Sequence, residues 1–486
     1  MKKNLLSVLL VAATTFSLAA CGSNNGGGGS TKEGTAGIVE EASKMTLAQL
    51  EEASKKEMEA TDTPFYIIGL TSALGKAAST FAKKYEWIHY GEEGVADNVR
   101  VKNDYKDYTL LTALESADES YVADYALVQD ERSLADYARA GLLHNFIPSD
   151  WQELGLSEAD TKKPLKGIHF NKLFYTNTNF QNKTGKTLNN IWQLAGTSED
   201  ANHLDNVSFQ TPVTEQINMS FLLSAMAPSN QERILSAYKD YYGKDWEPSQ
   251  YWIGDDVKKK LPEKAYTYVS AGEQWVREFV ANISRWHGSD GTAMKETQLK
   301  DDWDKGYVYY GAFAKMKDAV GKEYAVNIGE NVVDGEVQPV NAMYTVKWDW
   351  EIKGFNGFMY TMDSQIVNNA KHPYTACLYA RTLLTLDAYK GMIYNKDLPG
   401  ADDTVTYSWN TTGHKIADVL PDHGKVNQYG YYFPGSNDIT YAKGDWTRDQ
   451  HIAKELYEDY DFLKTIKGSQ VNTILAMVSE NKKVTA

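Results

Sequence analysis

Short apolar runs alternate with helical segments between residues 65 and 141, and this rhythm constrains the fold more than any other feature of the chain. The runs 65–70 and 125–128 have the length and composition of buried strands, and 99–101 alternates as a further strand. A helical pattern follows each strand, and the apolar face of the first helix consists of Leu74, Ala77, Ala78, Phe81 and Tyr85. This alternation predicts an α/β lobe with a mostly parallel sheet.

Polar residues follow the two buried strands directly. Thr71 and Ser72 come after the first run, and Gln129 and Asp130 come after 125–128. In parallel sheets, ligands bind beyond the carboxyl ends of the strands, where N–H groups at helix starts have no helical partner. Each of these residues alone is more simply a cap or a turn residue. Together they mark the edge of the sheet where we expect a ligand.

The amino terminus has the pattern of a secretory signal. Lys2 and Lys3 precede an apolar run over residues 5–18, which is too short to span a hydrocarbon core of about 30 Å. The run ends in Leu-Ala-Ala before Cys21, with small residues where a signal peptidase cuts. This motif resembles the bacterial lipobox, in which the cysteine is acylated and becomes the first mature residue.

An ordinary signal peptide with an incidental cysteine is the alternative. The glycine run 26–29 argues against it, because such a segment forms a flexible tether that holds a domain off a surface. We therefore predict a lipoprotein signal peptide over 1–20 and a lipidated tether with a surface helix over 21–61. A palmitate-type anchor on Cys21 would place the protein at the cell membrane, on its extracytoplasmic face.

Charge and cysteine content exclude several classes of protein. The net charge of −15 opposes binding to nucleic acid, which depends on neutralising phosphates with Lys and Arg. The negative charge also opposes binding of the protein surface to anionic lipid. We therefore expect the lipid anchor to be its contact with the membrane. Cys377 has no partner if Cys21 carries lipid, which leaves no internal disulfide. A chain of 486 residues is longer than most domains that fold around one hydrophobic core, so we expect two lobes.

Motifs in four segments of the chain occur in a fixed order: TSALG (71–75) with FAKKY (81–85), ADYALVQD (123–130), LFYTNT (173–178) with IWQL (191–194), and AKHPYTA (370–376). In order and spacing they resemble the conserved blocks of the family 1 extracellular solute-binding proteins, which serve ABC importers. The iron(III), polyamine and thiamine type of this family is the most similar by pattern.

The resemblance implies a type II periplasmic-binding fold, in which two α/β lobes are joined by a hinge of crossing strands and hold the ligand in an interlobe cleft. On this basis we predict lobe 1 from residues 62–178 with about 346–400, and lobe 2 from 179–345 with about 401–486. The implied function is capture of a small solute and its delivery to ABC permease subunits. No bond is broken, so we expect no enzyme activity and no cofactor, and we expect a monomer.

The same resemblance implies further ligand contacts. Tyr175 and Asn177 lie at the expected crossover between the lobes. Tyr309 and Tyr310 would close on the ligand from the second lobe. Aromatic walls and charge-assisted hydrogen bonds supply affinity in such clefts.

The residues leave the solute open among an iron(III) complex, a polyamine, an organic anion and a sugar. Iron-binding relatives use adjacent tyrosines, and Tyr309 with Tyr310 ahead of an expected helix at 312–319 is the best-placed pair. The chain has 32 tyrosines, so adjacent pairs arise by chance, and packing of these two side chains is the simpler interpretation. A polyamine would need carboxylates, for which Asp130 and the acidic run 301–304 are candidates, although a solvated charge run explains the latter as well.

Two rival classes are a surface-anchored carbohydrate-active enzyme, such as a glycosidase, and an adhesin. A glycosidase needs two carboxylates. Because the chain has 65 acidic residues, some pair will always have a suitable spacing, so such a pair is no evidence for an enzyme. HExxH and GxSxG motifs are absent from the sequence. An adhesin would more often show repeats, and the strand–helix alternation disfavours it.

Overall fold

The computed structural model describes residues 34–71, 73–103, 107–117, 121–177, 179–196, 200–247, 270–298, 306–312, 330–333, 336–339, 346–348, 351–385, 387–388 and 452–485. The predicted signal peptide, Cys21, Ser72 and the acidic run 301–304 lie outside these ranges. Within them, no helix combines the length and the apolar character needed to cross a membrane.

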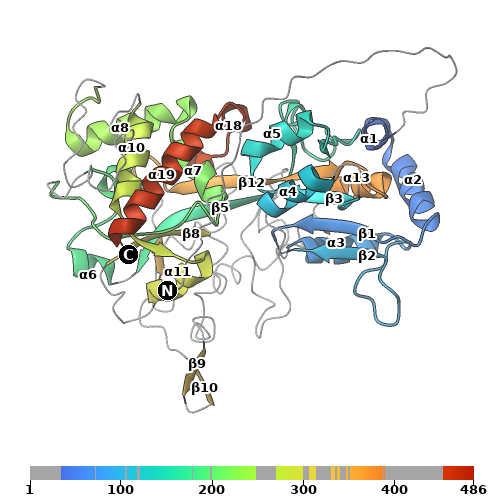
Figure 1. The fold of residues 1–486 in the computed structure, drawn as a ribbon, viewed down its shortest axis with the longest axis horizontal. Coiled ribbons are helices and arrows are strands. Elements are labelled where there is room, and N and C mark those ends of the chain that lie inside the picture. The colour runs from blue at the N-terminus through green and yellow to red at the C-terminus, as the bar shows by residue number, and fades with distance from the viewer. Residues whose placement is uncertain are drawn as a thin grey trace, which may run out of the picture.

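Two lobes lie side by side, and two long strands run from one to the other (Figure 1). In the first lobe β2, β1 and β3 are parallel neighbours in that order. Its elements are α1 (Thr35–Ala42), α2 (Leu47–Glu59), β1 (Phe65–Gly69), α3 (Ala73–Lys84), β2 (Val99–Lys102), α4 (Asp107–Ala117), β3 (Tyr125–Val128), α5 (Glu131–Arg139), β4 (Leu143–His144), η1 (Asp160–Lys162) and α13 (Pro373–Thr382).

The second lobe repeats this plan with parallel strands in the order β8, β6 and β7. Its elements are α6 (Phe180–Thr184), η2 (Ile191–Leu194), β6 (Val207–Gln210), α7 (Ile217–Ala225), η3 (Pro228–Asn230), α8 (Gln231–Tyr242), α10 (Ala271–Asn282), β7 (Ile283–His287), α11 (Asp290–Gln298), β8 (Val308–Ala312), β11 (Val346–Trp348) and α19 (Gly468–Thr485). A separate hairpin pairs β9 (Glu330–Val333) with β10 (Glu336–Pro339).

The strands that connect the lobes are β5 (Leu165–Asn177) and β12 (Gly357–Val367), which are antiparallel to each other. In the first lobe β12 pairs with β3 and β4, and in the second lobe β5 pairs with β8 and β11. The short strand β13 (Leu456–Tyr457) pairs with β12, and α18 (Tyr460–Leu463) follows it. The predicted architecture, two α/β lobes joined by crossing strands, is confirmed.

The first lobe follows local sequence signals closely. Thr46 and Gln49 form the capping box that begins α2, and Asp130 caps α5 by accepting a 3.2 Å hydrogen bond from the backbone N–H of Arg132. Gly141 adopts φ +74° just after α5, where glycine has no steric penalty. Here the predicted strands and helices match the observed ones.

Local sequence signals are less reliable guides in the second lobe. Thr211 and Pro212 have the pattern of a helix start, a capping residue followed by proline, but α7 begins later, at Ile217. The apolar pattern from Trp275 to Trp286 is typical of one helix, but α10 ends at Asn282 and Trp286 belongs to strand β7. Leu173, Phe174 and Tyr175 lie near the end of β5, which crosses the whole interface between the lobes.

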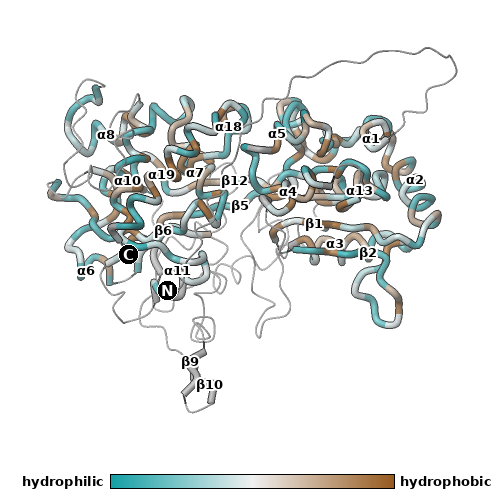
Figure 2. The backbone as a smooth tube through the Cα atoms, in the orientation of Figure 1, coloured by the Kyte–Doolittle hydropathy of each residue, from teal (hydrophilic) through white to brown (hydrophobic). Residues whose placement is uncertain are grey.

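One apolar core runs through the crossing strands and into both lobes. It includes Phe65 in the first lobe, Phe174 and Phe358 on the crossing strands, and Trp275 in the second lobe. In Figure 2 apolar segments gather along the inner strands, while hydrophilic residues lie on outer helices such as α2. The predicted lobe boundaries stay a prediction, although β11, assigned to the first lobe from sequence, pairs with β5 beside the second lobe.

Candidate functional site

The carboxyl ends of the parallel strands in both lobes face the same region. The last residue of β3, Val128, pairs with Asp363 on β12, on the side of the first lobe that faces the second. The last residue of β8, Ala312, pairs with Lys172 on β5, on the side of the second lobe that faces the first. Since β6 and β7 are parallel to β8, their ends face the first lobe too. Residues that follow these strands therefore meet between the lobes.

Direct contacts confirm that the two edges meet. Ser220 on α7 lies with its hydroxyl oxygen 3.5 Å from the Oδ1 atom of Asp130, the cap of α5. Gln129 hydrogen-bonds through its side chain to Tyr360 on β12. Asp130 also forms an ion pair with Arg132 at 3.0 Å. Gln129 and Asp130, predicted as ligand residues, are thus buried at the junction of the lobes.

A buried lysine forms the centre of the second-lobe half of the site. The Nζ atom of Lys172 lies 3.4 Å from Glu215, in the loop after β6, and 3.2 Å from Asp290, the first residue of α11. Only 1% of the lysine side chain is exposed. Burial lowers the pKa of Lys172, but the two carboxylates outweigh it and raise the pKa above its usual value. The ammonium group is therefore charged and shared by two acids.

Tyr310 and His287 complete this half of the site. Tyr310 is fully buried and its ring stacks on Phe221 with centroids 4.5 Å apart. Burial, with a contribution from Asp290, raises the pKa of its hydroxyl well above the usual range. The Nδ1 atom of His287 lies 3.0 Å from the hydroxyl of Ser208. Burial lowers the pKa of His287 to about 4, so the ring is neutral at pH 7.

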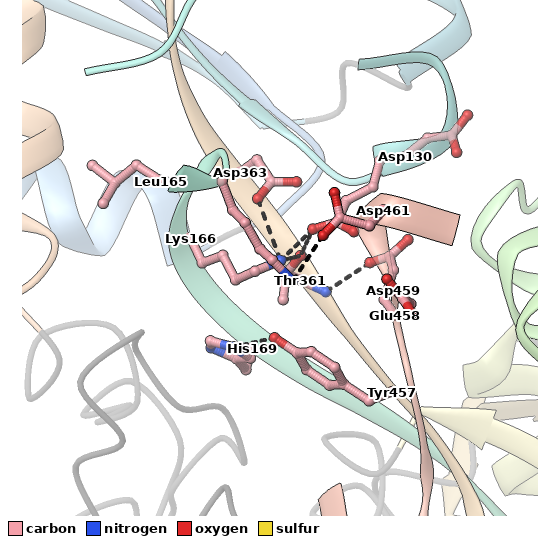
Figure 3. A network of polar contacts seen from close by, with 12 residues as sticks. Asp130, Leu165, Lys166, His169, Thr361, Asp363, Tyr457, Glu458, Asp459 and Asp461 are labelled. Atoms are coloured by element: carbon pink, nitrogen blue, oxygen red, sulfur yellow. Dashed lines mark hydrogen bonds and ion pairs between the residues drawn. The ribbon is translucent and has the colours of Figure 1, made fainter. Parts of the chain in front are cut away.

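A second buried lysine lies where the crossing strands meet the first lobe (Figure 3). The ammonium group of Lys166 forms an ion pair with Glu131, the first residue of α5, and donates a 3.2 Å hydrogen bond to the hydroxyl of Thr361. Asp363 lies 3.9 Å from the same ammonium. Glu458 accepts a 3.0 Å hydrogen bond from the backbone N–H of Thr361. One helix, both crossing strands and the C-terminal segment are joined at this point.

Carboxyl groups outnumber cations in this second group as well. Among the described residues Lys166 is the ammonium within 4 Å of Glu131 and Asp363, and Glu458 is buried beside them. Burial, with the neighbouring Glu131, raises the pKa of Glu458 well above its usual value. Glu458 therefore holds a proton where an exposed glutamate would be ionised, which relieves the excess of negative charge.

The remaining predicted residues lie in several places. Thr71 is half-buried at the end of β1, at the expected edge of the first-lobe sheet. Tyr175 and Tyr309 stack on each other, with ring centroids 5.7 Å apart, on strands against which α11 packs. Asn177 donates a 2.7 Å hydrogen bond to the backbone carbonyl of Thr297 in α11. Tyr175, Asn177 and Tyr309 thus make contacts within the second lobe.

Iron binding by the pair Tyr309 and Tyr310 stays a prediction that the strand geometry does not support. Both residues belong to strand β8, and the helix expected after them at 312–319 lies outside the described residues except for Ala312, which ends β8. Because neighbouring residues of a strand point to opposite faces, their hydroxyls diverge. Within the described ranges no group of three or more His, Cys, Asp or Glu side chains could hold a metal ion.

Four residues of the site were missed in the sequence: Lys172, Glu215, His287 and Asp290. Glu215, His287 and Asp290 lie at or just after the ends of β6 and β7, in the position that singled out Gln129 and Asp130 in the first lobe. Recognising 207–210 and 283–287 as strands would have found them. Lys172 gave no signal, because a lysine in an apolar strand looks like an exposed edge residue.

No known family model matches the chain, and no curated protein matches it. Solved structures that resemble it include substrate-binding proteins of ABC transporters. The PBP MotA from A. tumefaciens B6, in complex with glucopine, has a TM-score of 0.48 and 12% identity, over 86% of this chain and 100% of that one. Apo ferric ion-binding protein A of Pasteurella haemolytica has a TM-score of 0.46 and 12% identity, over 86% and 98%.

The spermidine/putrescine ABC transporter substrate-binding protein PotD of Streptococcus pneumoniae has a TM-score of 0.44 and 8% identity, over 87% of this chain and 100% of that one. At identities of 8–12%, the ligands of these three proteins do not indicate which ligand the present chain binds.

Proposed function

We propose that the protein is an extracytoplasmic receptor that captures a small solute between its lobes and delivers it to an ABC-type importer. The observation that supports this most directly is the position of the carboxyl ends of the parallel strands, which face one another across β5 and β12. Ligands of open α/β sheets bind at these ends. Gln129 and Asp130 on one side and Glu215 and Asp290 on the other are the polar groups available there.

The crossing strands support a mechanism of closure. Two lobes joined by β5 and β12 can change their relative orientation by small backbone rotations in these strands. A solute that contacts both lobes favours the closed arrangement by its extra affinity for that state. The permease would then distinguish the closed, loaded receptor from the open one.

The proposed cellular location rests on the sequence motif before Cys21 alone. We propose that Cys21 carries the lipid and that the chain works as a monomer on the outer face of the membrane. The permease subunits would be its protein partners. No catalytic step belongs to this proposal.

The proposal is tested with purified protein that starts after the tether. Native mass spectrometry of fresh material shows any solute carried through purification. A panel of amines, organic anions, iron(III) citrate and sugars is then screened for an increase in melting temperature. A solute that binds only the folded form adds about 2.7 kcal/mol at a hundredfold excess over its Kd.

Small-angle scattering of the same samples reports closure. We expect the radius of gyration to fall when the solute that stabilises the protein is added. Stabilisation without compaction would contradict closure of the lobes. Turnover of a glycoside, with release of a product, would contradict the receptor function itself.

A further inference from the structure

The second-lobe half of the site has hydrogen-bond acceptors without matching donors. The side-chain amide of Gln210 donates to the backbone carbonyl of Gly288 at 3.2 Å, and that of Asn218 donates to the backbone carbonyl of Gln210 at 2.8 Å. A carbonyl oxygen only accepts, so these bonds fix the orientation of both amides. The remaining atoms, Gln210 Oε1 and Asn218 Oδ1, have no donor among the described residues.

Both amide oxygens are buried: Gln210 is 5% exposed and Asn218 is 0% exposed. A buried acceptor without a donor is unfavourable, by about 1–3 kcal/mol. Gln210 ends β6, and its partner Gly288 lies in the loop between β7 and α11. The two acceptors therefore belong to the same edge of the sheet as Glu215 and Asp290.

The charged groups at this edge are unbalanced too, because carboxylates outnumber cations. Glu215 and Asp290 share the one ammonium group of Lys172, and both of these carboxylates remain partly accessible, with 18% and 16% of their side chains exposed. Across the interface Asp130 contacts Ser220, but its charge is balanced by the ion pair with Arg132, so the excess belongs to Glu215 and Asp290. An additional positive charge would be stabilised here, and an additional negative charge would be repelled.

Two further polar groups independently indicate a ligand. The hydroxyl of Tyr310, on a residue that is 0% exposed, and the Nε2 atom of His287, on a residue that is 3% exposed, have no hydrogen-bond partner within the described part of the chain. Asp290 contributes to the pKa of both groups, so each lies within electrostatic range of that carboxylate. Buried polar groups are almost always hydrogen-bonded, so their partner is expected to come from outside these residues.

We propose that the solute is an organic cation that carries a protonated amine or a guanidinium group, bound at the edge formed by Glu215, Asp290 and Gln210. This inference rests on the proposed receptor function and names its substrate class. Several N–H donors on one cation satisfy both imbalances, since they supply donors to the amide oxygens and neutralise the carboxylate pair. A sugar leaves the charge uncompensated, and an organic anion increases it.

The test compares probes that differ in charge and in donors, using titration calorimetry. Putrescine, spermidine and arginine carry N–H donors and positive charge, tetramethylammonium carries the charge alone, and citrate and maltose represent an anion and a sugar. We expect saturable binding of at least one N–H cation and none of tetramethylammonium. Glu215→Gln and Asp290→Asn should each weaken that binding by about tenfold or more, since charge-assisted hydrogen bonds are lost.

Glu158→Gln is the matched control, because Glu158 is an exposed carboxylate outside the site. It should bind the cation with unchanged affinity. The melting temperature without solute checks that each variant is folded, and Glu215→Gln, which replaces a partly exposed side chain with one of the same shape, is the variant that decides.

The outcomes separate this inference from the proposed function. Saturable binding of citrate or maltose with compaction, and of no cation, overturns the organic-cation proposal and leaves the receptor function standing. Binding of a cation with wild-type affinity in both variants overturns the assigned site. Failure of every probe, together with no solute retained in native mass spectrometry, overturns both proposals.

Discussion

The backbone N–H of Thr361 donates a 3.0 Å hydrogen bond to Glu458, so the crossing strand β12 is held by a residue from the end of the chain. The backbone N–H of Glu458 in turn donates to the carbonyl of Met359 at 2.9 Å. The helix that follows, α18, packs against α5 in the first lobe and α7 in the second. The segment around Glu458 therefore contacts both lobes where they would move relative to each other.

Replacing Glu458 with Gln should stabilise the protein at alkaline pH. Burial raises the pKa of Glu458 well above 4.5 in the folded chain, so the unfolded chain loses this proton first as the pH rises. The free energy of unfolding of the wild type then falls as the pH rises above 4.5, the ordinary pKa of a glutamate. Gln keeps an acceptor for Thr361 and does not titrate.

Urea unfolding across a range from about pH 4 to about pH 8 checks this relation. The difference between Glu458→Gln and wild type should be small at the acid end and should favour the variant increasingly toward the alkaline end. A variant that loses stability at every pH would show that the ionised carboxylate is needed.

Replacing Lys166 with Met should destabilise the protein by about 3–5 kcal/mol, because it leaves buried carboxylates without their cation. Glu131 and Asp363 are both 0% exposed. The double variant Lys166→Met with Glu131→Gln should recover part of this loss, since it removes one of the uncompensated charges. Thermal and urea unfolding of the two variants measure the effect, and equal stability of single and double variants would contradict it.

Replacing His287 with Asn should flatten the dependence of stability on pH below neutrality. The folded chain keeps His287 neutral down to about pH 4, whereas the unfolded chain protonates it near 6.5. Stability is therefore lost as pH falls from 6.5 toward 4, by on the order of 3 kcal/mol. Asn can keep the hydrogen bond to Ser208, and comparison of unfolding free energies at the two ends of this window isolates the contribution of the histidine.

Replacing Gly357 with Ala should disturb the crossing strands. A Cβ atom there would lie 2.1 Å from the backbone carbonyl oxygen of Lys172, so β5 and β12 would have to separate. Overpacking of this kind typically costs about 1–3 kcal/mol. Gly468→Ala is the control, because nothing lies within 4 Å of the added atom. Equal melting temperatures for the two variants would be the contrary result.

Replacing Cys21 with Ala should prevent lipid attachment. Labelled palmitate should enter the wild-type protein in growing cells and not the variant, which we expect as an uncleaved precursor or as protein shed into the medium. Fractionation of cells and medium provides the second measurement. Normal labelling and processing of the variant would exclude the lipobox.

The sequence alone was sufficient for the fold of the first lobe and for the position of two residues of the candidate site. Its strands and helices alternate with clear periodicity, and local signals such as the capping residues Thr46 and Asp130 depend on neighbours only a few residues away. The rule that ligands bind at the carboxyl ends of parallel strands then selected Gln129 and Asp130, which the structure places at the junction of the lobes.

Tertiary structure decided the rest, because burial and pairing between distant segments leave no local pattern. Lys172 meets Glu215 and Asp290 across 43 and 118 positions of the chain, and Thr361 meets Glu458 across 97. The same long-range pairing makes Tyr310 part of the site and turns Tyr309 away from it, since β8 is a strand only by virtue of its neighbours β5 and β6. Charged residues within an apolar sheet are stable only where folding brings their counter-charges to them.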